Sequence, residues 1–88
     1  MPDISFSEDA WADYLQLVSL DKALAKRVNA LLKDALRSPY EGLGKPEPLK
    51  YGLEGFWSRR ISDKDRLVYE VKDGAIRVIQ CRGHYEDN

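Results

Sequence analysis

The stretch RLVYEVKDGAIRVIQCR, residues 66–82, decides the fold of this 88-residue chain. Asp73-Gly74 at its centre is a strong signal for a two-residue hairpin turn. A turn at this point places Glu70 opposite Arg77, so that opposite charges pair across the two strands. The same register pairs the apolar residues of the other face, Val71 with Ile76 and Tyr69 with Val78. The stretch therefore predicts a β-hairpin with strands at 67–72 and 75–82.

Two helices are predicted before this hairpin. Alternation over residues 3–6 indicates a short strand, and Ser7 can cap a helix whose first turn holds two acidic residues. Asp21 can cap a second helix, which Ser38-Pro39 ends. The apolar residues of both helices recur at helical spacing. They are Ala10, Trp11, Tyr14, Leu15 and Val18 in the first helix, and Leu24, Val28, Leu31, Leu32, Ala35 and Leu36 in the second.

The predicted fold class is α+β: a strand, two helices, then a three-strand antiparallel meander with the helices packed on one sheet face. Residues 56–61 supply the first strand of the meander, and the glycine- and proline-containing segment 40–55 is expected to be an ordered loop. Side chains alternate between the faces of a strand. Arg66 and Cys81 are therefore expected on the face that the helices leave open.

Composition indicates one soluble domain, residues 1–88. Apolar residues make up 43% and charged residues 33% of the chain, as in ordinary folded proteins. Cys81, the single cysteine, excludes an internal disulfide and a cysteine zinc cage. With neither a secretory signal nor a membrane-length apolar stretch, a cytoplasmic location is expected. The net charge of −1 counts against nucleic-acid binding, but residues 45–82 hold nine basic against six acidic residues.

Three features indicate where chemistry could take place. Glu47 lies between two prolines, which stiffen the chain and present its carboxylate with little entropy to lose. Arg59-Arg60 and Arg66 lie on neighbouring predicted strands, where guanidinium groups fit phosphate oxygens. His84, the only histidine, can exchange a proton near neutral pH. Each feature taken alone also fits an ordinary solvated surface.

Together, Glu47, Arg66 and His84 supply what metal-independent RNA cleavage needs. When the RNA's own 2′-hydroxyl attacks the adjacent phosphorus, the reaction needs a base, an acid and positive charge on the phosphoryl oxygens. A metal mechanism is less attractive, because one histidine and scattered carboxylates form no ligand cluster in the sequence. A cysteine hydrolase is also a weak interpretation, because Cys81 on a strand is no nucleophile elbow.

The motifs of this chain closely resemble those of the YoeB toxins of the RelE/ParE superfamily. The resemblance spans nearly the whole sequence in order, and its central motifs are specific. They are EGLGKPEPLK at 41–50, GFWSRRI at 55–61, RLVY at 66–69 and CRGHY at 81–85.

The resemblance implies a toxin that cleaves messenger RNA on the ribosome without a cofactor. It implies Glu47 as general base, Arg66 as the group that stabilises the phosphorane, and His84 as general acid. Tyr85 would orient the scissile nucleotide by stacking. Lys50 and Arg60 match family positions near the substrate phosphates, and Lys45 and Arg59 are expected to contact ribosomal RNA. The implied partners are the ribosome, messenger RNA, a YefM-like antitoxin and a second copy of the chain, with no membrane.

Two departures from the family pattern leave alternatives open. The chain continues past Tyr85 with Glu86-Asp87-Asn88, which would place acidic groups beside the phosphate path, and it is mildly acidic where such toxins are commonly basic. One alternative is a non-catalytic toxin that acts by binding, for example to gyrase. Another is a ribonuclease that needs no ribosome, although few cations for phosphate contacts predict modest affinity for isolated RNA.

Overall fold

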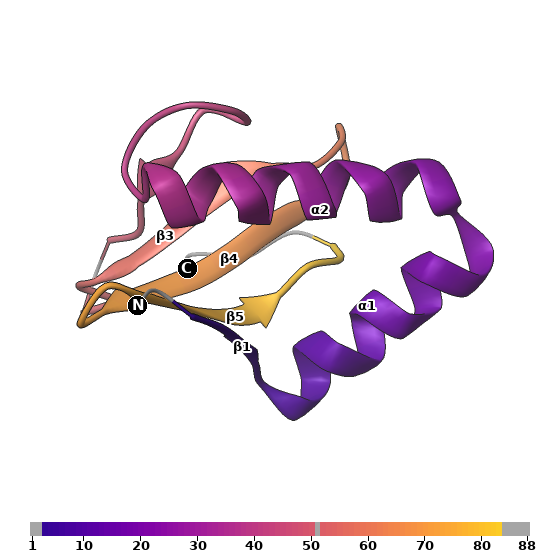
Figure 1. Ribbon diagram of the computed structural model, residues 1–88, viewed down its shortest axis with the longest axis horizontal. Helices are drawn as coiled ribbons and strands as arrows, with labels where there is room; N and C mark the ends of the chain where they lie inside the picture. Colours follow the sequence, from indigo (N-terminus) through magenta and orange to yellow (C-terminus); the bar gives the residue numbers. More distant parts are fainter. Residues whose placement is uncertain (1–2, 51, 84–88) are drawn as a thin grey trace.

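A computed structural model of the chain describes residues 3–50 and 52–83. These residues form two helices and a five-stranded sheet (Figure 1). The elements in chain order are β1 (Ile4–Phe6), α1 (Glu8–Leu20), α2 (Lys22–Arg37), β2 (Glu47–Pro48), β3 (Phe56–Arg60), β4 (Arg66–Lys72) and β5 (Ala75–Gln80). The predicted α+β class is confirmed.

The strands lie in the order β1-β5-β4-β3-β2. The meander β3-β4-β5 is antiparallel as predicted, and the expected pairs Glu70–Arg77 and Val71–Ile76 are present. Two strands extend the sheet beyond the prediction. β1 joins one edge by pairing in parallel with β5, and β2 joins the other edge by pairing with β3. Residues 47–48 therefore form a strand within segment 40–55, which was predicted to be a loop throughout.

Both helices begin at the predicted caps. The Ser7 hydroxyl accepts a hydrogen bond from the amide of Ala10 at 3.1 Å, and the Asp21 carboxylate accepts one from the amide of Leu24 at 3.1 Å. Each cap satisfies an amide that the first helical turn leaves without a partner. Because Asp21 also ends α1, the helices follow one another directly and form a helical hairpin.

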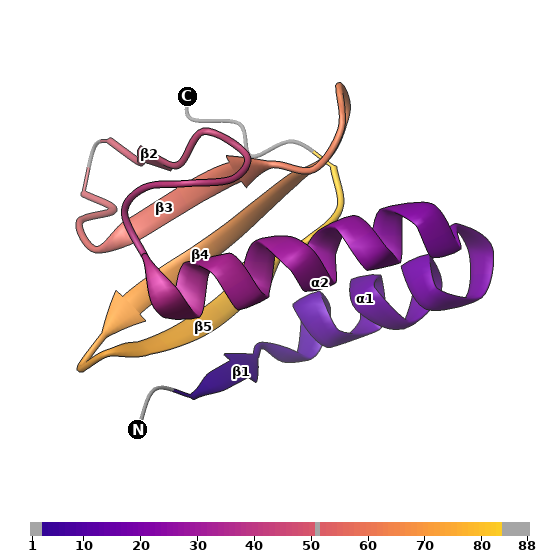
Figure 2. The same ribbon diagram turned by 45° about the horizontal axis from the view of Figure 1, so that its top comes forward.

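The core lies between the helices and one face of the sheet (Figure 2). Buried residues of α2, such as Val28 and Leu31, pack in one cluster with Leu67 of β4 and Ile76 of β5. α1 packs against α2 and β5. None of the helices in the described stretches is long and apolar enough to cross a membrane. Within residues 3–50 and 52–83, no helix covers the opposite sheet face, as predicted.

A β-bulge in β5 corrects one sequence prediction. Tyr69 pairs with Val78, but Val68 pairs with Gln80, so Ile79 is an extra residue in β5. An extra residue reverses the faces of the side chains that follow it. Cys81 was expected on the open face with Arg66, and this was wrong: its side chain is fully buried in the core cluster on the helix side.

Candidate functional site

A row of side chains crosses the open face of the sheet. Glu47 of β2 pairs with Ser58 of β3, Ser58 pairs with Val68 of β4, and Val68 pairs with Gln80 of β5. Directly opposite residues project from the same face, so these four side chains lie in line. Val68 is buried yet lies outside the core cluster, as expected for the face opposite the helices.

Arg66 lies beside this row. It precedes Val68 by two residues, so both point to the same face. Its Nε and Nη2 atoms donate hydrogen bonds to the Ser58 hydroxyl at 3.2 and 3.0 Å. Ser58 is itself the strand partner of Glu47. The half-buried guanidinium of Arg66 is therefore held close to the strand position that presents the Glu47 carboxylate.

Glu47 is presented from a rigid edge strand. Its side chain is exposed, and its neighbours Pro46 and Pro48 fix the backbone on both sides. Proline lacks a donor and is accommodated at sheet edges, where β2 lies. A hydrogen bond of 2.9 Å from the Leu49 amide to the carbonyl of Phe56 continues the pairing beyond β2. The carboxylate is thus open to solvent on a backbone that has little freedom.

Exposed cations surround the row. Arg60 is the strand partner of Arg66 and is exposed, and Lys45 and Lys50 are exposed on either side of β2. The backbone carbonyl of Arg60 accepts a hydrogen bond of 3.5 Å from the Arg27 guanidinium. The predicted RNA contacts at Lys45, Lys50 and Arg60 are therefore accessible to a polyanion.

The chain that leads to His84 is anchored at the same end of the sheet as Arg66. The carbonyl of Gly83 accepts hydrogen bonds from the Arg66 amide at 2.9 Å and from the Gln80 side chain at 3.0 Å. The Gly83 amide donates to the Asp65 carboxylate at 2.7 Å. His84 follows Gly83 directly in the sequence. His84 and Tyr85 themselves lie outside the described residues.

Sequence reasoning missed the side chains that fix this arrangement. Asp65 and Ser58 act through hydrogen bonds to partners that are distant in sequence, and Gln80 reaches the open face only because of the bulge at Ile79. Alternation along β3 was the one signal for Ser58, since it lies two residues from Arg60. Nothing local to Gln80 indicated its orientation.

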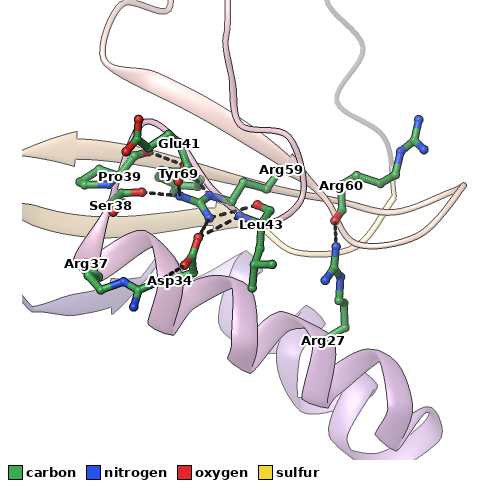
Figure 3. A network of polar contacts seen from close by, with 10 residues as sticks. All are labelled: Arg27, Asp34, Arg37, Ser38, Pro39, Glu41, Leu43, Arg59, Arg60 and Tyr69. Carbon is green, nitrogen blue, oxygen red and sulfur yellow. Dashed lines mark hydrogen bonds and ion pairs between the residues drawn. The ribbon is translucent and has the colours of Figure 1, made fainter.

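Arg59 does not occupy the position that was expected of it. It alternates with Ser58 and Arg60 along β3, so its side chain points to the helix side, where it is fully buried. Figure 3 shows its guanidinium beside the Asp34 carboxylate, with a distance of 2.7 Å between Nη1 and Oδ2. A buried guanidinium in an ion pair is not available to RNA phosphates. The predicted ribosomal RNA contact at Arg59 is therefore corrected to an internal ion pair.

The surroundings of Asp34 and Cys81 shift the pKa values of both groups. Hydrogen bonds from Arg59, and then from the Leu43 amide, hold the pKa of the Asp34 carboxyl below its usual range. Burial raises the pKa of the Cys81 thiol to about 12, and the thiol donates a hydrogen bond to the Ala10 carbonyl at 3.5 Å. A thiol with that pKa is protonated at neutral pH, so Cys81 is not a nucleophile. The open face, by contrast, carries the exposed Glu47 carboxylate and the half-buried Arg66 guanidinium.

The open face brings together a carboxylate, a hydrogen-bonded guanidinium and exposed cations. These groups can accept a proton and bind a phosphate. Within residues 3–50 and 52–83, no group of three or more His, Cys, Asp or Glu side chains is placed to hold a metal ion.

Comparisons with known proteins cover nearly the whole chain. A family model for the YoeB-like toxin of bacterial type II toxin–antitoxin systems matches residues 6–85. A toxin YoeB from Escherichia coli (strain K12) is 52% identical over 80 residues, which are 91% of this chain and 95% of the relative.

Two solved structures from Staphylococcus aureus have the same fold. A YoeB dimer aligns with a TM-score of 0.89 at 45% identity, covering 96% of this chain and 98% of that one. A YoeB–YefM complex aligns with a TM-score of 0.87 at 43% identity, covering 97% and 99%.

Proposed function

The chain belongs to the YoeB family of toxins from bacterial type II toxin–antitoxin systems, and we propose that it cleaves messenger RNA on the ribosome. One observation carries this proposal. Glu47 and Arg66 are presented on the same open sheet face, and the residue before His84 is hydrogen-bonded to the backbone of Arg66. A base, a phosphate-binding group and an acid are the set that cleavage by the RNA's own 2′-hydroxyl requires.

In the proposed reaction, Glu47 removes the proton of the 2′-hydroxyl. The 2′-oxygen then bonds to the adjacent phosphorus, and Arg66 stabilises the negative charge of the phosphorane. His84 gives a proton to the 5′-oxygen as its bond to phosphorus breaks. The products are a 2′,3′-cyclic phosphate and a 5′-hydroxyl end. Tyr85 orients the scissile nucleotide by stacking, and no metal ion takes part.

The cations of the open face bind the RNA backbone. Lys45, Lys50 and Arg60 are exposed around the Glu47–Ser58 pair and can neutralise phosphates. Their number is small and the whole chain has a net charge of −1. Affinity for naked RNA should accordingly be weak and sensitive to salt. This supports a requirement for the ribosome, which would supply most of the substrate contacts.

The proposed protein partners are a YefM-like antitoxin and a second copy of the chain, in the cytoplasm. Relatives have been solved as a YoeB dimer and as a YoeB–YefM complex. In this chain α1 exposes apolar side chains that a protein partner can cover. They are Trp11, Leu15, Val18 and Leu20, with exposed fractions of 47, 48, 42 and 74%.

Primer extension on a messenger RNA, with and without assembled ribosomes, tests the proposal. We expect discrete cuts only with ribosomes. Glu47→Gln and His84→Gln should each slow cleavage by about 10²–10⁴-fold, the usual contribution of a general acid or base. Glu8→Gln, which removes an exposed carboxylate at the start of α1, is the matched control and should cut like the parent.

Three results would contradict the proposal. Parental rates in both site variants would remove the assigned acid and base. Cuts in naked RNA at low protein concentration would indicate a ribosome-independent ribonuclease. Intact messenger RNA together with blocked DNA supercoiling would indicate a toxin that acts by binding gyrase.

A further inference from the structure

Arg59 lies at the centre of a buried polar cluster on the helix side of the sheet (Figure 3). Its five N–H donors meet five acceptors: the Tyr69 hydroxyl, the Asp34 carboxylate, and the backbone carbonyls of Ser38, Glu41 and Leu43. The distances run from 2.6 Å for Ser38 to 3.1 Å for Glu41. A guanidinium has five such donors, so every one is used.

Asp34 and Tyr69 extend the cluster to the same loop. Asp34 accepts a hydrogen bond from the Leu43 amide at 2.9 Å, and the Tyr69 hydroxyl donates one to the carbonyl of Pro39 at 2.8 Å. Burial raises the pKa of Tyr69, which keeps this hydroxyl protonated. Arg59, Asp34 and Tyr69, which we call the Arg59 cluster, therefore hold the backbone of residues 38–43 from the sheet and from α2.

Stability alone does not account for the Arg59 cluster. A buried ion pair often contributes no more stability than well-packed apolar residues would. Apolar side chains, however, could not satisfy the carbonyl groups of residues 38–44, which belong to no helix or strand. The cluster thus gives a segment without secondary structure a single backbone conformation.

The loop that is fixed in this way leads directly to Glu47. At the end of the loop, the carbonyl of Gly44 accepts a hydrogen bond of 2.8 Å from the Arg60 amide. Two residues of β3 therefore constrain neighbouring parts of the chain. Arg59 bonds to loop 38–44 on the helix side, and Ser58 pairs with Glu47, which follows the loop by three residues. Any shift of the loop is transmitted to Glu47 through only a few residues.

We propose that Arg59, Asp34 and Tyr69 are positioning residues that fix loop 38–44 and thereby hold Glu47 in register with Ser58, the hydrogen-bond partner of Arg66. The inference rests on the proposed ribonuclease function for its catalytic consequence. None of the three residues touches the RNA. Their effect is exerted through the backbone that presents the general base.

Tyr69→Phe is the most informative variant. It keeps the buried ring and removes only the hydroxyl that links Arg59 to the carbonyl of Pro39. Ile76→Val, which trims an apolar side chain in the same core, is the control for stability. Both are compared at a temperature at which urea denaturation shows them to be fully folded.

Cleavage is measured in a single turnover on saturating programmed ribosomes. We expect Tyr69→Phe to lower the rate constant by about tenfold or more, because a 1 Å misplacement in an active site can cost on the order of 100-fold. Its half-saturating ribosome concentration should stay within about twofold of the parent's, since the phosphate-binding side chains are retained. Ile76→Val should cut at the parental rate. A parental rate in Tyr69→Phe would overturn the inference.

Amide hydrogen exchange on the free protein separates this inference from the proposed function. The amides of Leu43 and Arg60, which bond to Asp34 and to Gly44, should exchange faster in Tyr69→Phe than in the parent and Ile76→Val. Unchanged exchange would overturn the inference whatever the cleavage result. If the parent does not cut RNA at all, the proposed function fails, and exchange alone decides whether the Arg59 cluster fixes the loop.

Discussion

Gly42 shows how closely loop 38–44 is packed against α2. It has a φ of +113°, and a Cβ atom added to it would lie 2.2 Å from Oδ2 of Asp34. Gly42→Ala must therefore displace the carboxylate that pairs with Arg59. We expect it to lower the free energy of unfolding by about 2–3 kcal/mol in urea denaturation, through backbone strain and the lost contact.

Gly74→Ala is the matched control for Gly42→Ala. Its φ of +78° brings similar backbone strain, but no atom of the described part of the chain lies within 4 Å of the added Cβ. We expect a loss of about 1 kcal/mol from strain alone. Equal losses at the two glycines would show that Asp34 moves aside without cost.

The neighbouring arginines 59 and 60 show how far single residues could be predicted. Alternation along a strand predicts that their side chains point to opposite faces, and the structure agrees. Which of the two is buried depends on Asp34 and Tyr69, which lie 25 and 10 residues away in the sequence. The sequence therefore placed Arg66 on the open face but could not distinguish the buried Arg59 from the exposed Arg60.

Local sequence signals correctly predicted the elements that form between residues close together in the chain. Asp73 and Gly74 have φ values of 53° and 78°, as a tight hairpin turn requires, and the strands on either side pair as expected. β2 was missed because its two residues become a strand only by pairing with β3. The bulge at Ile79 was missed for a similar reason, since it exists only in the register between β4 and β5.

Asp65 joins the turn between β3 and β4 to the chain that follows β5. Its carboxylate accepts hydrogen bonds from the Ser62 hydroxyl in the β3–β4 turn and from the Gly83 amide beyond β5. Asp65→Ala should free the chain that leads to His84 and slow ribosome-dependent cleavage by about tenfold or more. Asp65→Asn keeps an acceptor for Gly83 and should retain most of the rate.

Asp63→Ala is the control for Asp65→Ala. It removes an exposed carboxylate from the same turn and should leave cleavage unchanged. If Asp65→Ala cut as fast as Asp63→Ala, the hydrogen bond to Gly83 would have no part in placing the general acid.

The whole molecule divides its charged groups between the two faces of the sheet. The helix side holds the Asp34–Arg59 ion pair, and the open side holds Glu47, Arg66 and accessible cations. The predicted layering of helices on one sheet face explains this division. The sequence did not reveal that the buried side also determines the path of the loop to Glu47, because that depends on backbone carbonyls, which every residue has.

Acid should destabilise the molecule through Asp34. Its pKa is lowered in the folded state, chiefly by the hydrogen bond from Arg59, whereas an unfolded aspartate has a pKa of about 3.9. At pH values between the folded and the unfolded pKa of Asp34, the folded state therefore binds fewer protons than the unfolded state. The resulting stability is present above the unfolded pKa and is lost as the pH falls through the folded pKa. Urea denaturation between pH 6 and pH 3 should show a steep loss below about pH 4.

Asp34→Asn assigns that loss to one carboxyl group. The variant is less stable at neutral pH, because the Arg59 charge stays buried without its counterion. Its stability should nevertheless fall less between pH 5 and pH 3 than that of the parent, since the asparagine does not titrate. NMR titration of Asp34 in the parent gives the same information without a variant. Parallel pH profiles for the two proteins, or a normal Asp34 pKa, would show that Arg59 does not hold this carboxylate ionised.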